Sequence, residues 1–62
     1  MRAVIIERDG AWQVRGVAGN KLPTKFSETI LLWVSHNEES AVEKCFKYDD
    51  TGTATYVFLD GE

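Results

Sequence analysis

Two segments of this chain have the composition of strands that are apolar on both faces. Residues 28–35 contain five consecutive apolar residues, and residues 53–59 combine threonine with aromatic and aliphatic side chains. Both patterns favour β-strands, although a helix remains the alternative for residues 28–35. Strands of this kind are normally covered on both sides. Other segments of the chain are therefore needed to cover both faces of the sheet.

The first part of the chain predicts a β-hairpin. Residues 2–7 and 11–17 have the composition of strands, and we expect them to be joined by a three-residue loop that ends at Gly10 in the left-handed conformation. This register would place Val4 opposite Val14 on the core face. A two-residue turn, which shifts the pairing by one residue, is the alternative.

One amphipathic helix is predicted after the third strand. Either Ser35 or Asn37 can cap its first turn, and Gly52 is a suitable residue to end it. Five apolar residues recur at three- and four-residue spacing, which indicates a single buried stripe. These residues are Ala41, Val42, Cys45, Phe46 and Tyr48.

The predicted order of elements is β-β-β-α-β, within a single domain of residues 1–62. We expect an α+β fold in which one helix packs on one face of a small sheet. The sheet is expected to have three to four strands and to be mostly antiparallel. Since one helix shields one face only, the second face remains to be covered.

Reactive residues are scarce. His36 and Cys45 are the only histidine and the only cysteine, so neither a disulfide nor a cysteine-based zinc cluster can form within one chain. No nucleophile, base and orienting group can be assembled from the sequence. We therefore expect no catalytic, cofactor or metal site, and no enzymatic activity.

The apolar runs are short, and the longest covers residues 30–34. A membrane span needs about 20 apolar residues, so no contact with a membrane is expected. The low cysteine content is typical of a reducing compartment. These features predict a cytoplasmic protein.

Charge is distributed unevenly. Residues 1–25 hold five basic and two acidic residues, whereas residues 26–62 hold two basic and eight acidic ones, and the net charge is −3. The helix and its exit turn carry five of the acidic residues, Glu38, Glu39, Glu43, Asp49 and Asp50. We expect them to form an acidic ridge that binds a protein with a basic, nucleic-acid-binding groove by mimicking the nucleic acid. A solvated helix face is the alternative.

The second sheet face provides another candidate surface. Strand alternation groups Leu31 with Trp33 on one side of the third strand, and Val57 with Leu59 on one side of the last strand. An exposed apolar patch of this composition would mark an interaction site. The alternative is that the loop of residues 22–26 folds over this face.

The N-terminal hairpin and its following loop carry a small basic group next to Trp12. Arginine and lysine beside an aromatic residue can bind single-stranded nucleic acid. The net acidic charge disfavours direct nucleic-acid binding, because phosphate contacts need clustered basic residues. The basic residues are Arg2, Arg15, Lys21 and Lys25.

These observations predict a non-catalytic binding protein that modulates or inhibits a larger intracellular machine. In size and charge the chain is similar to compact inhibitors that phages and mobile elements encode against host systems. Two alternatives remain open. One is a homo-oligomeric accessory domain, such as a homodimer paired through its sheet. The other is a weak nucleic-acid-binding module that uses the basic hairpin.

Overall fold

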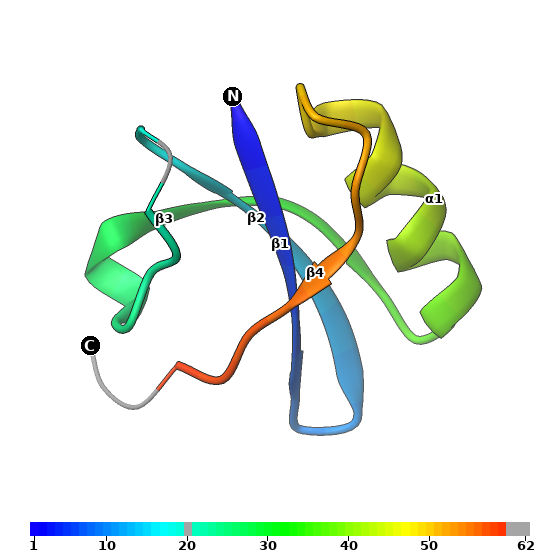
Figure 1. The fold of residues 1–62 in the computed structure, drawn as a ribbon. Helices are drawn as coiled ribbons and strands as arrows, with labels where there is room; N and C mark the ends of the chain where they lie inside the picture. The colour runs from blue at the N-terminus through cyan, green and yellow to red at the C-terminus, as the bar shows by residue number, and fades with distance from the viewer. Residues whose placement is uncertain (20, 60–62) are drawn as a thin grey trace.

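A computed structural model of the chain describes residues 1–19 and 21–59 and has an α+β fold (Figure 1). A four-stranded sheet carries one α-helix, as the sequence predicts. The elements are β1 (Arg2–Arg8), β2 (Ala11–Val17), the short 3-10 helix η1 (Phe26–Glu28), β3 (Thr29–Ser35), α1 (Glu38–Tyr48) and β4 (Thr55–Tyr56).

The strand order in the sheet is β3-β2-β1-β4. The β1–β2 and β2–β3 pairs are antiparallel, and β4 runs parallel to β1. The third strand is confirmed, and the helical alternative for that segment is wrong. The last strand is shorter than predicted, since only Thr55–Tyr56 pairs as a strand. It starts late because Thr53 is bonded to the helix exit through Asp49.

The hairpin register differs from the preferred prediction. Ile5 lies opposite Val14 and Glu7 lies opposite Trp12, so the alternative with a two-residue turn is the correct one. The expected pairing of Val4 with Val14 is wrong, because Val4 lies opposite Arg15.

The turn explains this register. Asp9 and Gly10 both have positive φ angles, of 55° and 77°. Two consecutive left-handed residues form a primed turn, whose twist matches the twist of the flanking strands. The backbone amide of Gly10 also donates to the Glu7 carboxylate, at 3.2 Å. Turn geometry therefore outweighs the more favourable side-chain pairing that the longer loop would have given.

The helix begins where the sequence predicts it. The Asn37 side chain accepts hydrogen bonds from the amides of Glu39 and Ser40, at 2.8 and 3.4 Å, so Asn37 rather than Ser35 is the N-cap. The helix ends at Tyr48 with Asp49 as its C-cap, and Gly52 adopts a positive φ of 69° in the exit turn.

The main core lies between α1 and the sheet. It is formed by Ala3, Ile5, Val14, Ala41 and Cys45, each of which is fully buried. Because side chains alternate along a strand, Val4 and Ile6 point to the side of the sheet opposite α1, which is called the far side below. They are buried as well.

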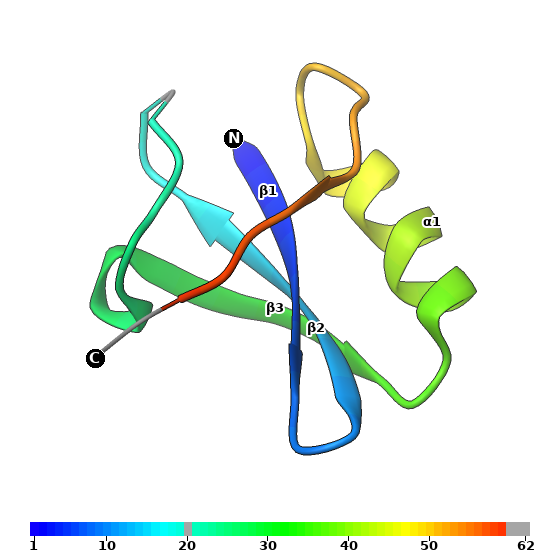
Figure 2. The same cartoon turned by 60° about the horizontal axis from the view of Figure 1, so that its bottom comes forward.

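The far side is covered by irregular segments. Figures 1 and 2 show α1 on one side of the sheet and η1 with its preceding loop on the other. Pro23 in this loop is buried, and the ring of Phe26 in η1 contacts arginines of β1 and β2 that face the far side. The predicted alternative of a folded-over loop therefore applies to part of this face.

A β-bulge interrupts β3. Val14 pairs with Trp33 and the next residue, Arg15, pairs with Leu31, so Leu32 is the extra residue of β3. Because Val14 and Arg15 face opposite sides of the sheet, Leu31 and Trp33 do so too. The expected grouping of these two residues on one side is wrong, since the bulge shifts the alternation by one residue.

Candidate functional site

The outer edge of β3 carries the largest group of exposed apolar side chains on any strand of the described residues. Ile30 is 66% exposed, Leu31 48%, Trp33 37% and Val34 47%, and these four form what we call the β3 edge surface. The strand is at one end of the sheet order and contains no charged residue. An edge strand without charges or proline presents free backbone groups for pairing with another chain.

The bulge distributes the β3 edge surface over both sides of the sheet. Ile30 and Trp33 share a side with α1, and Nζ of Lys44 on α1 lies 4.3 Å from the centre of the Trp33 ring. Leu31 and Val34 lie on the far side, opposite Arg15 and Gln13 of β2. A partner on this strand would therefore contact apolar side chains above and below its own backbone.

Val57 and Leu59 follow β4, the strand at the other end of the sheet order from β3. The amide of Val57 donates to the carbonyl of Ile5 at 3.0 Å, which places Val57 beside β1 on its β4 side, with β1 and β2 between it and β3. From there the chain runs across the far side, as both views show (Figures 1 and 2). Both residues are half-buried.

Three of the predicted acidic residues, Glu38, Glu39 and Glu43, are exposed on α1. Glu38 accepts a hydrogen bond from the Tyr56 hydroxyl, at 2.5 Å, and this bond raises the pKa of Tyr56. The Tyr56 ring in turn meets Trp12 edge to face, with 6.0 Å between the ring centres. The contact links the first turn of α1 to β4.

Asp49 is buried and belongs to the structural framework rather than to an exposed ridge. Its carboxylate accepts hydrogen bonds from the amides of Ala3, Thr51 and Thr53, at 2.8, 3.1 and 3.2 Å. The hydroxyls of Thr51 and Thr53 donate to it as well. These donors, led by the Thr51 hydroxyl, hold the pKa of Asp49 far below its ordinary value. The Asp-x-Thr-x-Thr spacing after the helix is the signal that sequence reasoning missed.

Asp50 remains exposed beside the start of β1. Its carboxylate forms an ion pair with the amino group of Met1, and its amide donates to the Met1 carbonyl at 2.9 Å. The acidic ridge therefore consists of the three helix glutamates, with Asp50 partly neutralised and Asp49 removed from the surface.

Two arginines converge on one aromatic ring on the far side. The guanidinium carbons of Arg8 and Arg15 lie 4.6 and 5.0 Å from the centre of the Phe26 ring. Arg15 also donates to the Thr29 hydroxyl at 2.6 Å and to the Gln13 side-chain oxygen at 2.7 Å. We call Arg8, Arg15 and Phe26 the arginine–phenylalanine cluster.

The cluster was missed at the sequence level. The prediction that Arg15 lies next to Trp12 is wrong, because Trp12 is on the α1 side, against Tyr56, whereas Arg15 is on the far side. Burial and the neighbouring charge of Arg8 lower the pKa of Arg15. The guanidinium groups of Arg8 and Arg15 are therefore close enough for the charge of Arg8 to lower the pKa of Arg15.

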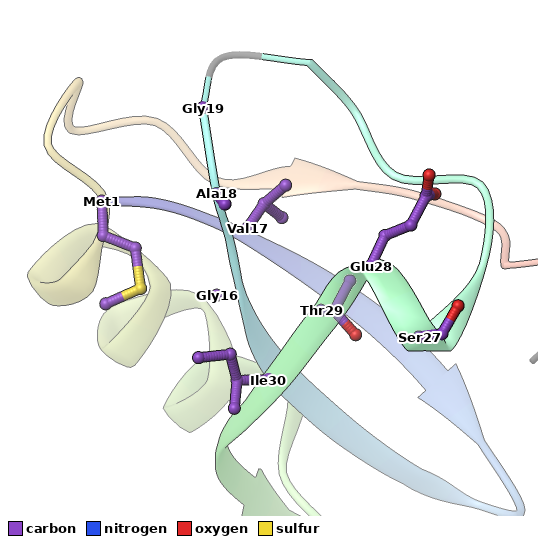
Figure 3. A pocket seen from close by; sticks show the side chains of 9 residues that line it. All are labelled: Met1, Gly16, Val17, Ala18, Gly19, Ser27, Glu28, Thr29 and Ile30. Atoms are coloured by element: carbon purple, nitrogen blue, oxygen red, sulfur yellow. The ribbon is translucent and has the colours of Figure 1, made fainter.

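A hollow of about 360 Å³ opens between the end of β2 and the start of β3 (Figure 3). It is lined by Met1, Gly16, Val17, Ala18, Gly19, Ser27, Glu28, Thr29 and Ile30. Its one carboxylate, that of Glu28, already accepts from the amides of Thr24 and Lys25, at 2.8 and 3.1 Å. A ligand in the hollow would thus meet mainly apolar groups, because the Glu28 carboxylate is already hydrogen-bonded to the backbone of the loop.

His36 and Cys45 are not brought together. His36 is exposed, whereas Cys45 is buried and its thiol lies 3.5 Å from the Ala3 carbonyl. Burial raises the pKa of Cys45, which keeps it as a thiol. Within residues 1–19 and 21–59, no three metal-binding side chains cluster, and no helix is long and apolar enough to cross a membrane.

No family model, curated protein or solved structure matches this chain.

Proposed function

We propose that this chain is a non-catalytic protein-binding domain that contacts its partner through the β3 edge surface. The observation that carries the proposal is an uncharged edge strand with four large apolar side chains exposed. An extended segment that pairs with such an edge gains backbone hydrogen bonds, and its side chains contact the exposed apolar groups on both faces. The modulation or inhibition of a larger intracellular machine is part of this proposal.

The acidic ridge supports the same function in a different way. Glu38, Glu39 and Glu43 lie on α1, and Lys44 of the same helix reaches Trp33 in the β3 edge surface. Exposed charges of one sign raise the rate of association with a partner of the opposite sign more than they raise affinity. A partner with a basic groove would be attracted by the ridge and held by the β3 edge surface.

The test is quantitative capture of partners from the native host, with mass spectrometry of what co-elutes. Ile30→Lys places a charge on the edge strand and is expected to abolish capture. Phe58→Lys is the matched control, because Phe58 is 85% exposed and lies outside β3. Equal capture by wild type and Ile30→Lys would contradict the proposal, as would equal loss in both variants.

A homodimer is the second candidate, and the absence of charge in β3 favours it. Two antiparallel copies of Thr29–Ser35 would bring no like charges together, although the chain as a whole is acidic. Light scattering over a concentration series tests this candidate. A dimer that Ile30→Lys dissociates supports pairing through β3, and a strict monomer at high concentration excludes it.

A further inference from the structure

The arginine–phenylalanine cluster concentrates positive charge on the far side of the sheet. Arg8 is at the end of β1 and Arg15 lies within β2, yet both side chains extend to the same ring. Cation–π contacts of this kind hold a guanidinium in place without neutralising it. The ring therefore fixes the position of two cations that would otherwise repel each other.

Little negative charge compensates these cations in the part of the chain that the structure describes. The hydrogen bonds of Arg15 go to a hydroxyl and an amide oxygen, both neutral, and no described carboxylate lies within ion-pair distance of it. Arg8 has one acidic neighbour, Asp9, at 3.9 Å. A pair at that distance on an exposed turn contributes little.

We infer that the arginine–phenylalanine cluster binds carboxylate groups of an acidic peptide segment in a partner protein. A guanidinium presents a planar fork of donors that matches a carboxylate, and two of them beside one another suit neighbouring acidic side chains. Since this names the chemistry of a protein partner, it rests on the proposed function.

The surroundings favour a peptide over a nucleic acid. Single-stranded nucleic acid is bound by stacking bases on open aromatic faces, whereas the guanidinium groups already lie over the Phe26 ring. Leu31 lies beside Arg15 on the far side and is exposed, so apolar residues of a peptide would find a contact there.

Titration of the isotope-labelled protein with hexaglutamate, followed by NMR, tests the inference. We expect the side-chain Nε resonances of Arg8 and Arg15 to shift, and the shifts to weaken as salt is raised. Arg8→Gln is expected to weaken binding about tenfold, the equivalent of one charge-assisted hydrogen bond. Lys47→Gln removes the same charge from α1 and should change binding less than about twofold, as expected for an exposed charge outside the site.

Arg15 needs a milder variant, because it also bonds to β3. Arg15→Lys keeps the charge but loses the fork, and should weaken binding while the backbone resonances of Val14 and Ala3 stay in place. Equal weakening by Arg8→Gln and Lys47→Gln would show that only net charge matters and would overturn the site.

Two further titrations separate the possible ligands. Tighter binding of oligothymidylate, or equal binding of inorganic phosphate, would overturn the assignment to a peptide. The absence of any shift with hexaglutamate would overturn the inference as a whole. The proposed function would be unaffected in that case, because it is tested separately by Ile30→Lys.

Discussion

The two sides of the sheet are covered by different kinds of structure. On one side, α1 places Ala41 and Cys45 on Ile5 and Val14, and all four are fully buried. On the far side, the cover consists of irregular segments and the one-turn helix η1; Val4 and Ile6 are buried there, but Leu31 and its neighbour Val34 are exposed. A helix satisfies its own backbone hydrogen bonds and presents a continuous apolar stripe, whereas a loop covers a surface only where individual side chains reach it.

The two sides also differ in charge. The α1 side carries three exposed glutamates, whereas the far side carries Arg8 and Arg15. The charge imbalance along the sequence thus becomes a difference between two surfaces. One is suited to a basic partner and the other to an acidic one.

A matched pair of core substitutions tests the comparison most strongly. Ile5→Ala, beneath α1, is expected to lower the free energy of unfolding by about 4 kcal/mol, and Ile6→Ala, on the far side, by about 2 kcal/mol. The difference is expected because a loop collapses into a new cavity more readily than a helix does. Urea denaturation measures both values, and a larger loss for Ile6→Ala would reverse the comparison.

Replacement of the buried carboxylate on the α1 side should have the next largest effect. Asp49→Asn retains the size of the side chain but turns an NH₂ group toward backbone and hydroxyl donors, so we expect a loss on the order of 3 kcal/mol. Thermal and urea unfolding at neutral pH measure it. Asp50→Asn is the control, because that carboxylate is exposed.

The same carboxylate predicts a pH dependence. The folded pKa of Asp49 is lowered, so its contribution to stability is complete at neutral pH and is lost as the pH falls below the ordinary value of 3.8. Asp49→Asn should remove this part of the acid sensitivity. An identical loss of stability between pH 5 and pH 2 in wild type and variant would contradict the assignment.

The helix cap should have a smaller effect. Asn37→Ala removes the acceptor of two amides in the first turn of α1 and is expected to lower stability by about 1 kcal/mol. Asn37→Asp restores an acceptor and should recover most of the loss. If Asn37→Ala is neutral, packing rather than capping determines where the helix begins.

Phe26→Leu should have the smallest effect on stability. The substitution keeps an apolar side chain over the far side but removes the ring that both guanidinium groups contact, and we expect a loss of less than about 1 kcal/mol. A loss above 2 kcal/mol would mean that η1 belongs to the core as firmly as α1 does.

Local patterns were sufficient to identify the four strands and α1, but not η1 or the short extent of β4. The run at residues 28–35 predicted a strand, and Asn37 was one of the two caps considered for α1. The candidate surfaces were predicted less well, because each depended on a contact between distant residues. Asp49 was assigned to the ridge, yet it is held by Ala3 from the other end of the chain.

The sequence by itself determined the order of strands and helix along the chain and the uneven distribution of charge. Composition and periodicity are enough for this, because they depend on only a few neighbouring residues. The hairpin register was left between two turns until the structure showed the Asp9–Gly10 turn. Only the tertiary structure decided the bulge in β3 and the meeting of Arg8 with Arg15 over Phe26. The register and the bulge are each a one-residue choice in pairing, which moves side chains to the opposite face of a sheet, and the contact over Phe26 joins residues that are distant in the sequence.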